Sequence, residues 1–190
     1  MKTLPIETAL ARVLLRRVRS SDARTIFDLV NDPDVVRWTT RIPHPYPQGG
    51  AVRFIRKAQR DWRNGHAFIL GIVLKEEGQL AGIISLSGIS HRHGCAELGF
   101  WLGQRYWGQG LMTEAARGIL QLGFETLQLN RIYASAFEQN HASRRVLEKC
   151  GFQVEGILRE AVFRYDARQN YVNFGILRRE HPPSARNNKS

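Results

Sequence analysis

The stretch from residue 97 to residue 116, ELGFWLGQRYWGQGLMTEAA, constrains the fold more than any other part of the chain. A β-rich run passes into a loop with glycines at 108 and 110, and a helical pattern begins soon after the second glycine. Glycine lets successive backbone N–H groups converge on one point, and the start of the helix adds a partial positive charge beside the full charge of Arg105. This arrangement predicts a pyrophosphate site.

Two common phosphate motifs do not fit this loop. A Walker loop needs Lys and then Ser or Thr after its last glycine, where this chain has Leu111 and Met112. A dinucleotide fingerprint needs a small residue where Thr113 stands, within a parallel strand–helix–strand unit. The pattern that remains is Gln or Arg, two residues, Gly, one residue, then Gly or Ala. Two glycines taken alone would fit an ordinary turn before a helix.

Strand and helix patterns predict one domain around a mixed sheet. The 190 residues are 43% hydrophobic, which is enough for a single core. Strands are expected at 12–18, 67–74, 80–87, 96–102, 131–137, 154–165 and 171–177, and helices from a cap at 20–22 to 30, then at 51–64, 113–126 and 141–149. Because hairpins flank the alternating middle, we expect a mostly antiparallel sheet rather than a doubly wound parallel one. The domain is placed at 7–180, with a polar tail at 181–190.

Composition excludes several classes of protein. No stretch approaches about 18 apolar residues without charge, so we expect no membrane span. Charges at Lys2, Glu7 and Arg12 interrupt any signal-peptide core. Cys95 and Cys150 are too few for a disulfide framework, and we therefore expect a cytoplasmic protein.

The chain is strongly basic, with 28 Lys and Arg against 17 Asp and Glu, and 23 of the 28 are arginines. The planar fork of arginine favours bound anions, which leaves nucleic acid, an acidic protein or a phosphorylated cofactor as partners. One stripe of the helix at 51–64 carries five of these cations, Arg53, Arg56, Lys57, Arg60 and Arg63. A nucleic-acid-binding module is therefore one alternative, although Trp62 falls on the apolar stripe and is expected to pack rather than stack on bases.

His91, His93 and Cys95 alternate, and on a strand they would bring two histidines and a thiol to one side. Gly94 lies among them and no fourth ligand is nearby. We interpret the segment as a hairpin turn, and expect neither a metal site nor a cysteine nucleophile.

Further motifs accompany the glycine loop along the chain. Residues 7–8 and 12–16 read ET and RVLLR, residues 140–152 read NHASRRVLEKCGF, and residues 155–159 read EGILR. Together they resemble the GNAT N-acetyltransferase superfamily, and within it the ribosomal-protein serine or alanine N-acetyltransferases. The matches run in order from about residue 7 to residue 178.

The resemblance implies a single α/β (α+β) domain whose central sheet has splayed middle strands, with acetyl-CoA as co-substrate in the opening. The backbone of Phe100, Trp101 and Leu102 would pair with the pantetheine arm, and Asn140 would face the arm's far side. The pyrophosphate would be cradled by a segment in which we single out Gln104, Arg105, Gly108, Gln109, Gly110, Leu111 and Met112. Transfer would be direct, from thioester to primary amine, without an acyl-enzyme and without a metal.

Two side chains are the catalytic candidates. Strand alternation puts Glu97 on the same face as Trp101, where its carboxylate would act through water as the base for the amine. The alternative is a strand glutamate paired with an arginine such as Arg131. Ser143 would hydrogen-bond the departing sulfur at a helix start, where the dipole favours thiolate. The alternative is a first-turn residue of a helix capped by Asn140.

The acceptor that the resemblance implies is the N-terminal α-amine of a protein or peptide, such as a ribosomal protein. An α-amine has a pKa of about 8 and loses its proton more readily than lysine. A small amine, an antibiotic or a polyamine, is the alternative. If the basic stripe at 51–64 walls the acceptor groove, it favours acidic peptides over cationic ones. We expect no membrane partner and no nucleic acid as direct substrate.

The sequence departs from the serine acetyltransferases at one position. Those enzymes place a second glutamate where this chain has Val162, and Glu160 lies two residues earlier. On a regular strand Glu160 and Val162 would share a face.

Overall fold

The computed structural model describes residues 7–181, with side chains from residue 10 onward. One sheet of eight strands runs through this part of the chain, in the order β1-β2-β3-β4-β5-β6-β8-β7. Neighbouring strands are antiparallel except β5 and β6, which are parallel. The predicted mixed, mostly antiparallel sheet with flanking helices is thus confirmed.

The bounds of the strands are β1 (Glu7–Ala9), β2 (Val13–Arg17), β3 (Phe68–Leu74), β4 (Leu80–Ser90), β5 (Cys95–Leu102), β6 (Arg131–Phe137), β7 (Gln153–Arg164) and β8 (Ala167–Leu177). The α-helices are α1 (Ala23–Val30), α2 (Pro33–Val36), α3 (Gly50–Arg63), α4 (Leu111–Gln121) and α5 (His141–Lys149). Short 3-10 turns are η1 (Ser20–Asp22), η2 (Gln104–Tyr106) and η4 (Arg178–Glu180), and the π-helical turn η3 (Leu122–Thr126) continues α4.

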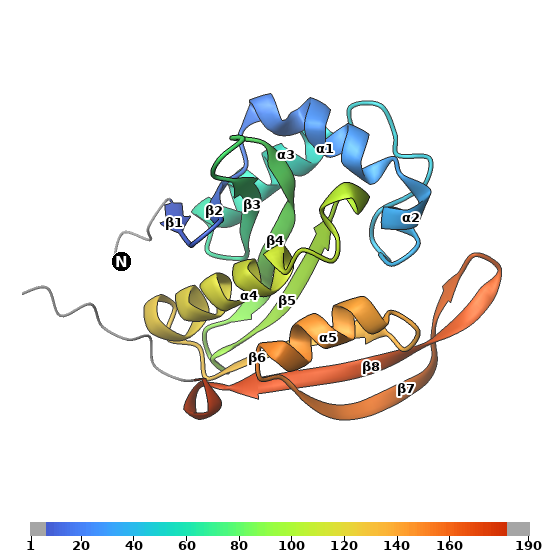
Figure 1. Cartoon of the computed structure of the whole chain (residues 1–190). Helices are drawn as coiled ribbons and strands as arrows, with labels where there is room; N and C mark the ends of the chain where they lie inside the picture. Colours follow the sequence, from blue (N-terminus) through green and yellow to red (C-terminus); the bar gives the residue numbers. More distant parts are fainter. Residues whose placement is uncertain (1–6, 182–190) are drawn as a thin grey trace, which may run out of the picture.

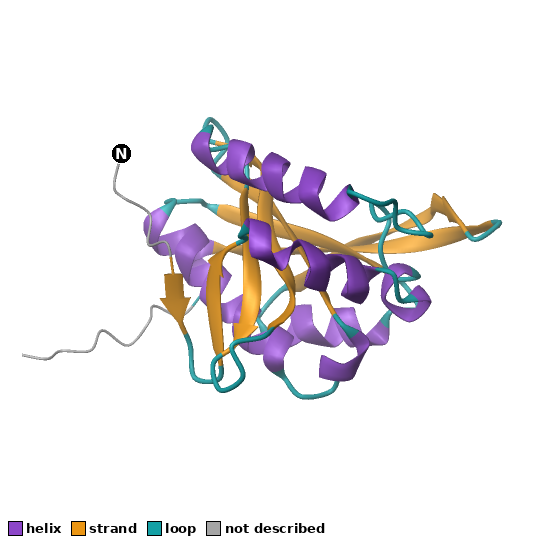
Figure 2. Cartoon of the chain, turned by 90° about the horizontal axis from the view of Figure 1, so that it is seen from above, coloured by secondary structure: helices purple, strands orange, loops and turns teal. Residues whose placement is uncertain are grey.

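Helices cover both faces of the sheet, as the view from above shows (Figure 2). On one face, α4 packs its buried alanines and Ile119 against strand residues such as Ile84. On the other, α1 and α3 pack Ile26 and Ile55 against residues such as Ile83. Alternate residues of the central strands therefore serve two cores, which explains their nearly continuous hydrophobic runs.

The middle of the sheet opens because β5 and β6 pair over only three residues. Their register runs from Cys95↔Arg131 to Glu97↔Tyr133 and then stops. Beyond Glu97, β5 stays paired with β4, and β6 stays paired with β8. The two strands diverge toward the start of α4 and α5 (Figure 1). One backbone edge of β5, from residue 98 to residue 102, is left without a strand partner.

One short helix was not predicted, and one predicted loop is wrong. The helix that was expected to stop at Asn31-Asp32-Pro33 does stop, but α2 begins at once, because Asp32 accepts a hydrogen bond from the Asp34 amide and Pro33 occupies the first helical position. The loop expected at 166–170 is a two-residue turn instead. Tyr165 and Asp166 both have positive φ, 51° and 56°, which suits a tight hairpin turn, and β8 therefore starts at Ala167.

Two further predictions concern the C-terminal tail and the absence of a membrane span. The predicted polar tail at 181–190 lies outside the described residues apart from His181. Within residues 7–181, none of the helices is both long enough and apolar enough to cross a membrane.

Candidate active site

The glycine loop between β5 and α4 has the conformation that an anion site requires. Gly108 and Gly110 have φ of 74° and 76°, a left-handed conformation that side chains other than glycine seldom adopt. Gly110 is the N-cap of α4, and no side chain caps this helix start. The first amides of α4 have no intrahelical acceptor, so they remain available to an anion.

The open space in front of the glycine loop also suits an anion site. A Cβ built on Gly108 would meet no atom within 4 Å. The loop therefore presents its backbone outward rather than against other protein atoms. Both features fit a pyrophosphate cradle at the start of α4, which begins two residues before the predicted helix.

A cavity of about 400 Å³ joins this loop to the opening in the sheet. Seven of the predicted cofactor residues line it from the β5 side and the loop, namely Phe100, Trp101, Leu102, Gly108, Gly110, Leu111 and Met112. Asn140 and Ser143 line it from α5, on the opposite side. The backbone carbonyl of Leu102 accepts a hydrogen bond from the Trp107 indole at 2.9 Å, so this oxygen already has a partner.

Three predicted cofactor side chains do not line this cavity. Gln104 donates to Asp34 at 3.0 Å, and Gln109 donates to the Arg105 carbonyl at 3.0 Å. The Arg105 guanidinium lies over the Tyr106 ring, 4.7 Å from its centroid. In this conformation the three side chains contact neighbouring protein groups rather than the cavity.

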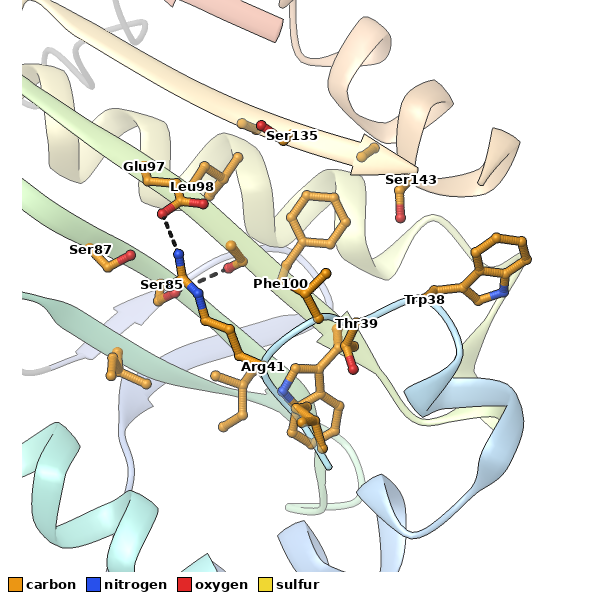
Figure 3. Close-up of a pocket in the computed structure, with 18 of the residues that line it drawn as sticks. Trp38, Thr39, Arg41, Ser85, Ser87, Glu97, Leu98, Phe100, Ser135 and Ser143 are labelled. Carbon is orange, nitrogen blue, oxygen red and sulfur yellow. Dashed lines mark hydrogen bonds and ion pairs between the residues drawn. The ribbon is translucent and has the colours of Figure 1, made fainter. Parts of the chain in front are cut away.

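A second cavity, of about 610 Å³, lies further back along β5, where residues 97–101 line it, whereas residues 100–102 line the first. Its lining comes from many elements: α1, the loop between α2 and α3, α3, β3, β4, β5, β6, α5 and β8. Glu97 lies at the point where β5 and β6 separate, and its side chain is 30% exposed. Figure 3 shows Glu97 and Ser143 reaching into this space from two elements, with Phe100 between them in the view.

Glu97 has an arginine partner, and it is not the predicted one. The Arg41 guanidinium, from the loop between α2 and α3, donates to the Glu97 carboxylate at 2.8 Å (Figure 3). Arg131 pairs instead with Glu155 on β7. The hydrogen bonds from Arg131 lower the pKa of Glu155. Burial, together with the charge of Glu97, raises the pKa of the neighbouring Tyr133.

Ser143 combines both of the expected geometries. Asn140 caps α5, because its side-chain oxygen accepts a hydrogen bond from the Ser143 amide at 3.0 Å. The Ser143 hydroxyl is nonetheless on the surface of both cavities. Ser143 is thus a first-turn residue of a capped helix and also faces the space between the cavities.

The sequence was also compared with known proteins. Residues 12–153 match the family described as Acetyltransferase (GNAT) domain. The chain belongs to the GNAT acetyltransferase family. It is 30% identical to YdaF of Bacillus subtilis (strain 168), provisionally named a ribosomal N-acetyltransferase, over 88% of this chain and 92% of YdaF. It is 27% identical to the spermidine N(1)-acetyltransferase of Escherichia coli (strain K12), over 89% of this chain and 88% of that enzyme.

A solved structure agrees with these matches. The Mycobacterium smegmatis RimJ in complex with CoA-disulfide superimposes with a TM-score of 0.83 at 25% identity, covering 93% of this chain and 89% of RimJ. The chain is therefore an acetyl-CoA-dependent N-acetyltransferase, as the resemblance implied.

The basic stripe of this GNAT enzyme does not wall the second cavity, so the condition for a preference for acidic peptides is not met there. Helix α3 contributes Phe54, Lys57 and Asp61 to the lining, and Lys57 pairs with Asp61. The four arginines of the stripe, Arg53, Arg56, Arg60 and Arg63, are not among the lining residues. The helix turns its apolar stripe toward the body of the protein, so most of its charge faces away from the cavity.

The structure of this GNAT enzyme also shows where Glu160 and the two histidines of the proposed turn lie. Glu160 lies at a bulge of β7 with φ of 52°, exposed and 3.9 Å from Arg168, so the regular strand face shared with Val162 does not exist. His91 and His93 lie in the turn between β4 and β5, as expected. Within residues 7–181 there is no group of three or more His, Cys, Asp or Glu placed to hold a metal ion.

Sequence reasoning missed several residues at the two cavities. Arg145 and Lys149 of α5 line the first cavity, and their i,i+4 spacing was a signal in the sequence. Trp38 lines both cavities, and Arg41 lines the second. Both belong to an irregular loop, where no periodicity reports which way a side chain points.

Proposed function

We propose that this enzyme acetylates the N-terminal α-amine of a peptide or protein by direct transfer, with acetyl-CoA and the acceptor bound together. The observation that carries the proposal is the meeting of the two cavities at the split between β5 and β6. Six residues line both cavities: Trp38, Thr39, Phe100, Trp101, Asn140 and Ser143. A thioester held in the first cavity (the cofactor-side cavity) and an amine entering the second (the acceptor-side cavity) would meet there.

The side chains at this meeting point have complementary roles in the transfer. Acetyl-CoA supplies the acetyl group as an activated thioester. Glu97 accepts, through water, the proton that the amine loses as the new C–N bond forms. Ser143 donates a hydrogen bond to the sulfur as the C–S bond breaks and the sulfur leaves as a thiolate. The proton that Glu97 accepted from the amine then returns through water to the thiolate, which becomes the thiol of CoA.

The cofactor is held by the chain's backbone more than by its side chains. The amides at the start of α4 and the loop from Gly108 to Gly110 bind the pyrophosphate. The edge of β5 at 100–102 that has no strand partner binds the pantetheine arm, with Asn140 across from it. Arg145 and Lys149 add positive charge to the same cavity.

Charge in the acceptor cavity favours a peptide over a polyamine. The charged residues that line it are Arg41, Lys57, Asp61 and Glu97, and each carboxylate is paired with one of the cations. A polyamine with several positive charges would find no carboxylate free of a partner among these residues. The name of YdaF supports a ribosomal protein as the natural acceptor, whereas the similarity to spermidine N(1)-acetyltransferase supports the rival.

Release of free CoA from acetyl-CoA, measured with matched acceptors, tests this proposal. The panel consists of peptides that begin with Ala or Ser, the same peptides blocked at the α-amine but carrying one lysine, and spermidine. We expect kcat/KM to be highest for the free α-amine and to fall at least about tenfold for the blocked peptide. Faster turnover of spermidine or of the lysine side chain than of every free α-amine would refute the proposal.

A further inference from the structure

The two ion pairs in the acceptor-side cavity are built differently. Lys57 and Asp61 lie one turn apart on α3, the Asp61 side chain is 10% exposed, and Arg60 stands beside it at 3.8 Å. Arg41 and Glu97 come from separate elements, and their side chains are 76% and 30% exposed. The first pair is closed within one helix. The second spans the space that an acceptor has to enter.

The pair between Arg41 and Glu97 is also the one that a ligand can open at little cost. Arg41 lies on the loop between α2 and α3, and Figure 3 shows its side chain extended across the cavity to the Glu97 carboxylate. Because the Arg41 side chain is largely exposed, water competes for it, and the pair contributes less stability than a buried one. A molecule that offers its own charges to both partners can therefore replace the pair.

We propose that Arg41 is a specificity residue that binds a carboxylate carried by the acceptor close to its amine. This rests on the proposed function, because it assumes that the amine enters this cavity. The two charges of the acceptor would replace the two charges of the pair, its carboxylate on Arg41 and its amine toward Glu97. The planar guanidinium can hold a carboxylate through two hydrogen bonds, which makes the contact selective for geometry as well as charge.

The other groups around Glu97 leave this role to Arg41. Lys57 is occupied by Asp61. The hydroxyls of Ser85 and Ser135 donate to the Gly99 carbonyl at 3.3 Å and to the Asn173 side chain at 2.8 Å. An acceptor without a carboxylate leaves Arg41 paired with Glu97. An acceptor with a carboxylate draws Arg41 away, and the freed Glu97 oxygen can then receive the proton of the amine.

Two sources of the carboxylate share this chemistry, and the test separates them. One is the side chain of Asp or Glu at the second residue of a peptide. The other is the carboxylate of a free acidic amino acid. The acceptors are therefore C-terminally amidated tetrapeptides that begin Ala-Asp or Ala-Asn and continue identically, together with free aspartate and asparagine. The measured quantity is the ratio of kcat/KM for the acidic member of each pair to that for its amide.

For the wild-type enzyme we expect a ratio of about ten or more in one of the two pairs, since a hydrogen bond to a charged group is worth this much. The contact with Arg41 should lower KM, and the release of Glu97 should raise kcat. Arg41→Gln should bring the ratio close to one, and Arg41→Lys should keep part of it. Lys57→Gln removes an equal charge from the same cavity and should keep most of the ratio. Arg24→Gln, on the exposed face of α1, controls for net charge.

Each outcome has one meaning. A ratio near one in the wild-type enzyme, or a ratio that survives Arg41→Gln, overturns the role of Arg41 while peptide acetylation stands. Acetylation of free aspartate but of no peptide overturns the proposed function, whereas an Arg41-dependent ratio for aspartate over asparagine still supports the carboxylate contact. If Lys57→Gln and Arg41→Gln lower the ratio equally, the preference comes from the general positive potential of the cavity rather than from a contact with Arg41. That result would also overturn the role of Arg41.

Discussion

The two cavities that meet at β5 differ in how their residues are spread along the chain. The cofactor side takes most of its lining from two short segments, 100–113 and 140–149, with a few residues from α2 and the loop after it. The acceptor side takes its lining from nine elements or loops between Ile26 and Tyr171. The first cavity is formed mainly by local conformation, and the second only by the packing of distant elements.

This difference also sets what each side contributes to function. In the proposed function, the cofactor side works through backbone amides, positive φ and a helix start, which many side chains can accompany. The acceptor side would work through individual side chains that line it, among them Glu97, Arg41 and Trp38. A substitution on the cofactor side should therefore act through conformation and affinity, and one on the acceptor side through turnover and choice of acceptor.

The largest effect is expected from Glu97→Gln. If Glu97 receives the proton of the amine, kcat should fall by roughly 10²–10⁴-fold while the affinity for acetyl-CoA stays unchanged. Glu155→Gln is the matched control, because Glu155 is also a strand glutamate paired with an arginine, but it does not line the acceptor-side cavity. Stopped assays of free CoA and titration of acetyl-CoA measure the two quantities. Similar kcat values for the two variants would remove Glu97 from the mechanism.

The second largest effect is expected from a substitution in the glycine loop, which tests the backbone conformation there rather than the chemistry of a side chain. Gly108→Val should weaken acetyl-CoA binding by about tenfold or more, since a left-handed residue costs about 1–2 kcal/mol when it carries a Cβ, and the new atoms crowd the anion site. Gly78→Val is the control: Gly78 has φ of 65° in the hairpin turn between β3 and β4, and a Cβ there likewise meets no atom within 4 Å. If both variants lose stability alike and bind acetyl-CoA alike, the loop is not the pyrophosphate site.

The features that could be predicted from the sequence are those that depend on neighbouring residues in the chain. The strands and helices from β3 to α5 were predicted almost residue by residue, because each follows its own periodicity and caps. The glycine loop was recognisable because its conformation depends on Gly108 and Gly110 themselves. Arg41 could not be found, since 56 positions separate it from Glu97 and it lies in a loop without regular structure. The bulge at Glu160 was hidden for the same reason, because its register is set by β8.

A smaller effect distinguishes the two α5 residues that both cavities share. Ser143→Ala should lower kcat by about tenfold through the lost hydrogen bond to the sulfur, with little change in melting temperature. Asn140→Ala should instead lower the free energy of unfolding by about 1 kcal/mol, because it removes the cap of α5. Turnover and thermal unfolding of both variants give the comparison. A stability loss in Ser143→Ala with unchanged kcat would make Ser143 a purely structural residue.

The smallest effect concerns α4, the helix whose start is proposed to bind the pyrophosphate. Burial works to raise the pKa of Glu114 on α4, but the hydrogen bonds it accepts from the amides of Arg12 and Val13 and from the Arg12 side chain outweigh burial and lower it. A carboxylate with a lowered pKa in the folded state stabilises the protein above its unfolded pKa of about 4.5, and this contribution is lost as pH falls through the folded value.

Glu114→Gln should therefore reduce the free energy of unfolding by about 1 kcal/mol at neutral pH. The difference from the wild-type protein should shrink below about pH 4.5. Glu76→Gln, in the exposed hairpin turn, is the control for loss of one charge. Chemical unfolding of the wild-type protein and of both variants between pH 3 and pH 7 would measure these differences in the free energy of unfolding. A difference between the two proteins that does not change with pH would mean that Glu114 is held by packing alone.

The central claim is that both cavities are filled at the same time and that the acetyl group passes directly between them at the split in the sheet. Initial velocities measured while acetyl-CoA and the fastest acceptor of the panel are varied together test it most directly. Double-reciprocal plots should intersect, and an isolated enzyme incubated with acetyl-CoA alone should carry no acetyl group. Parallel lines, or an acetylated enzyme that passes its acetyl group to the acceptor after acetyl-CoA is removed, would contradict direct transfer.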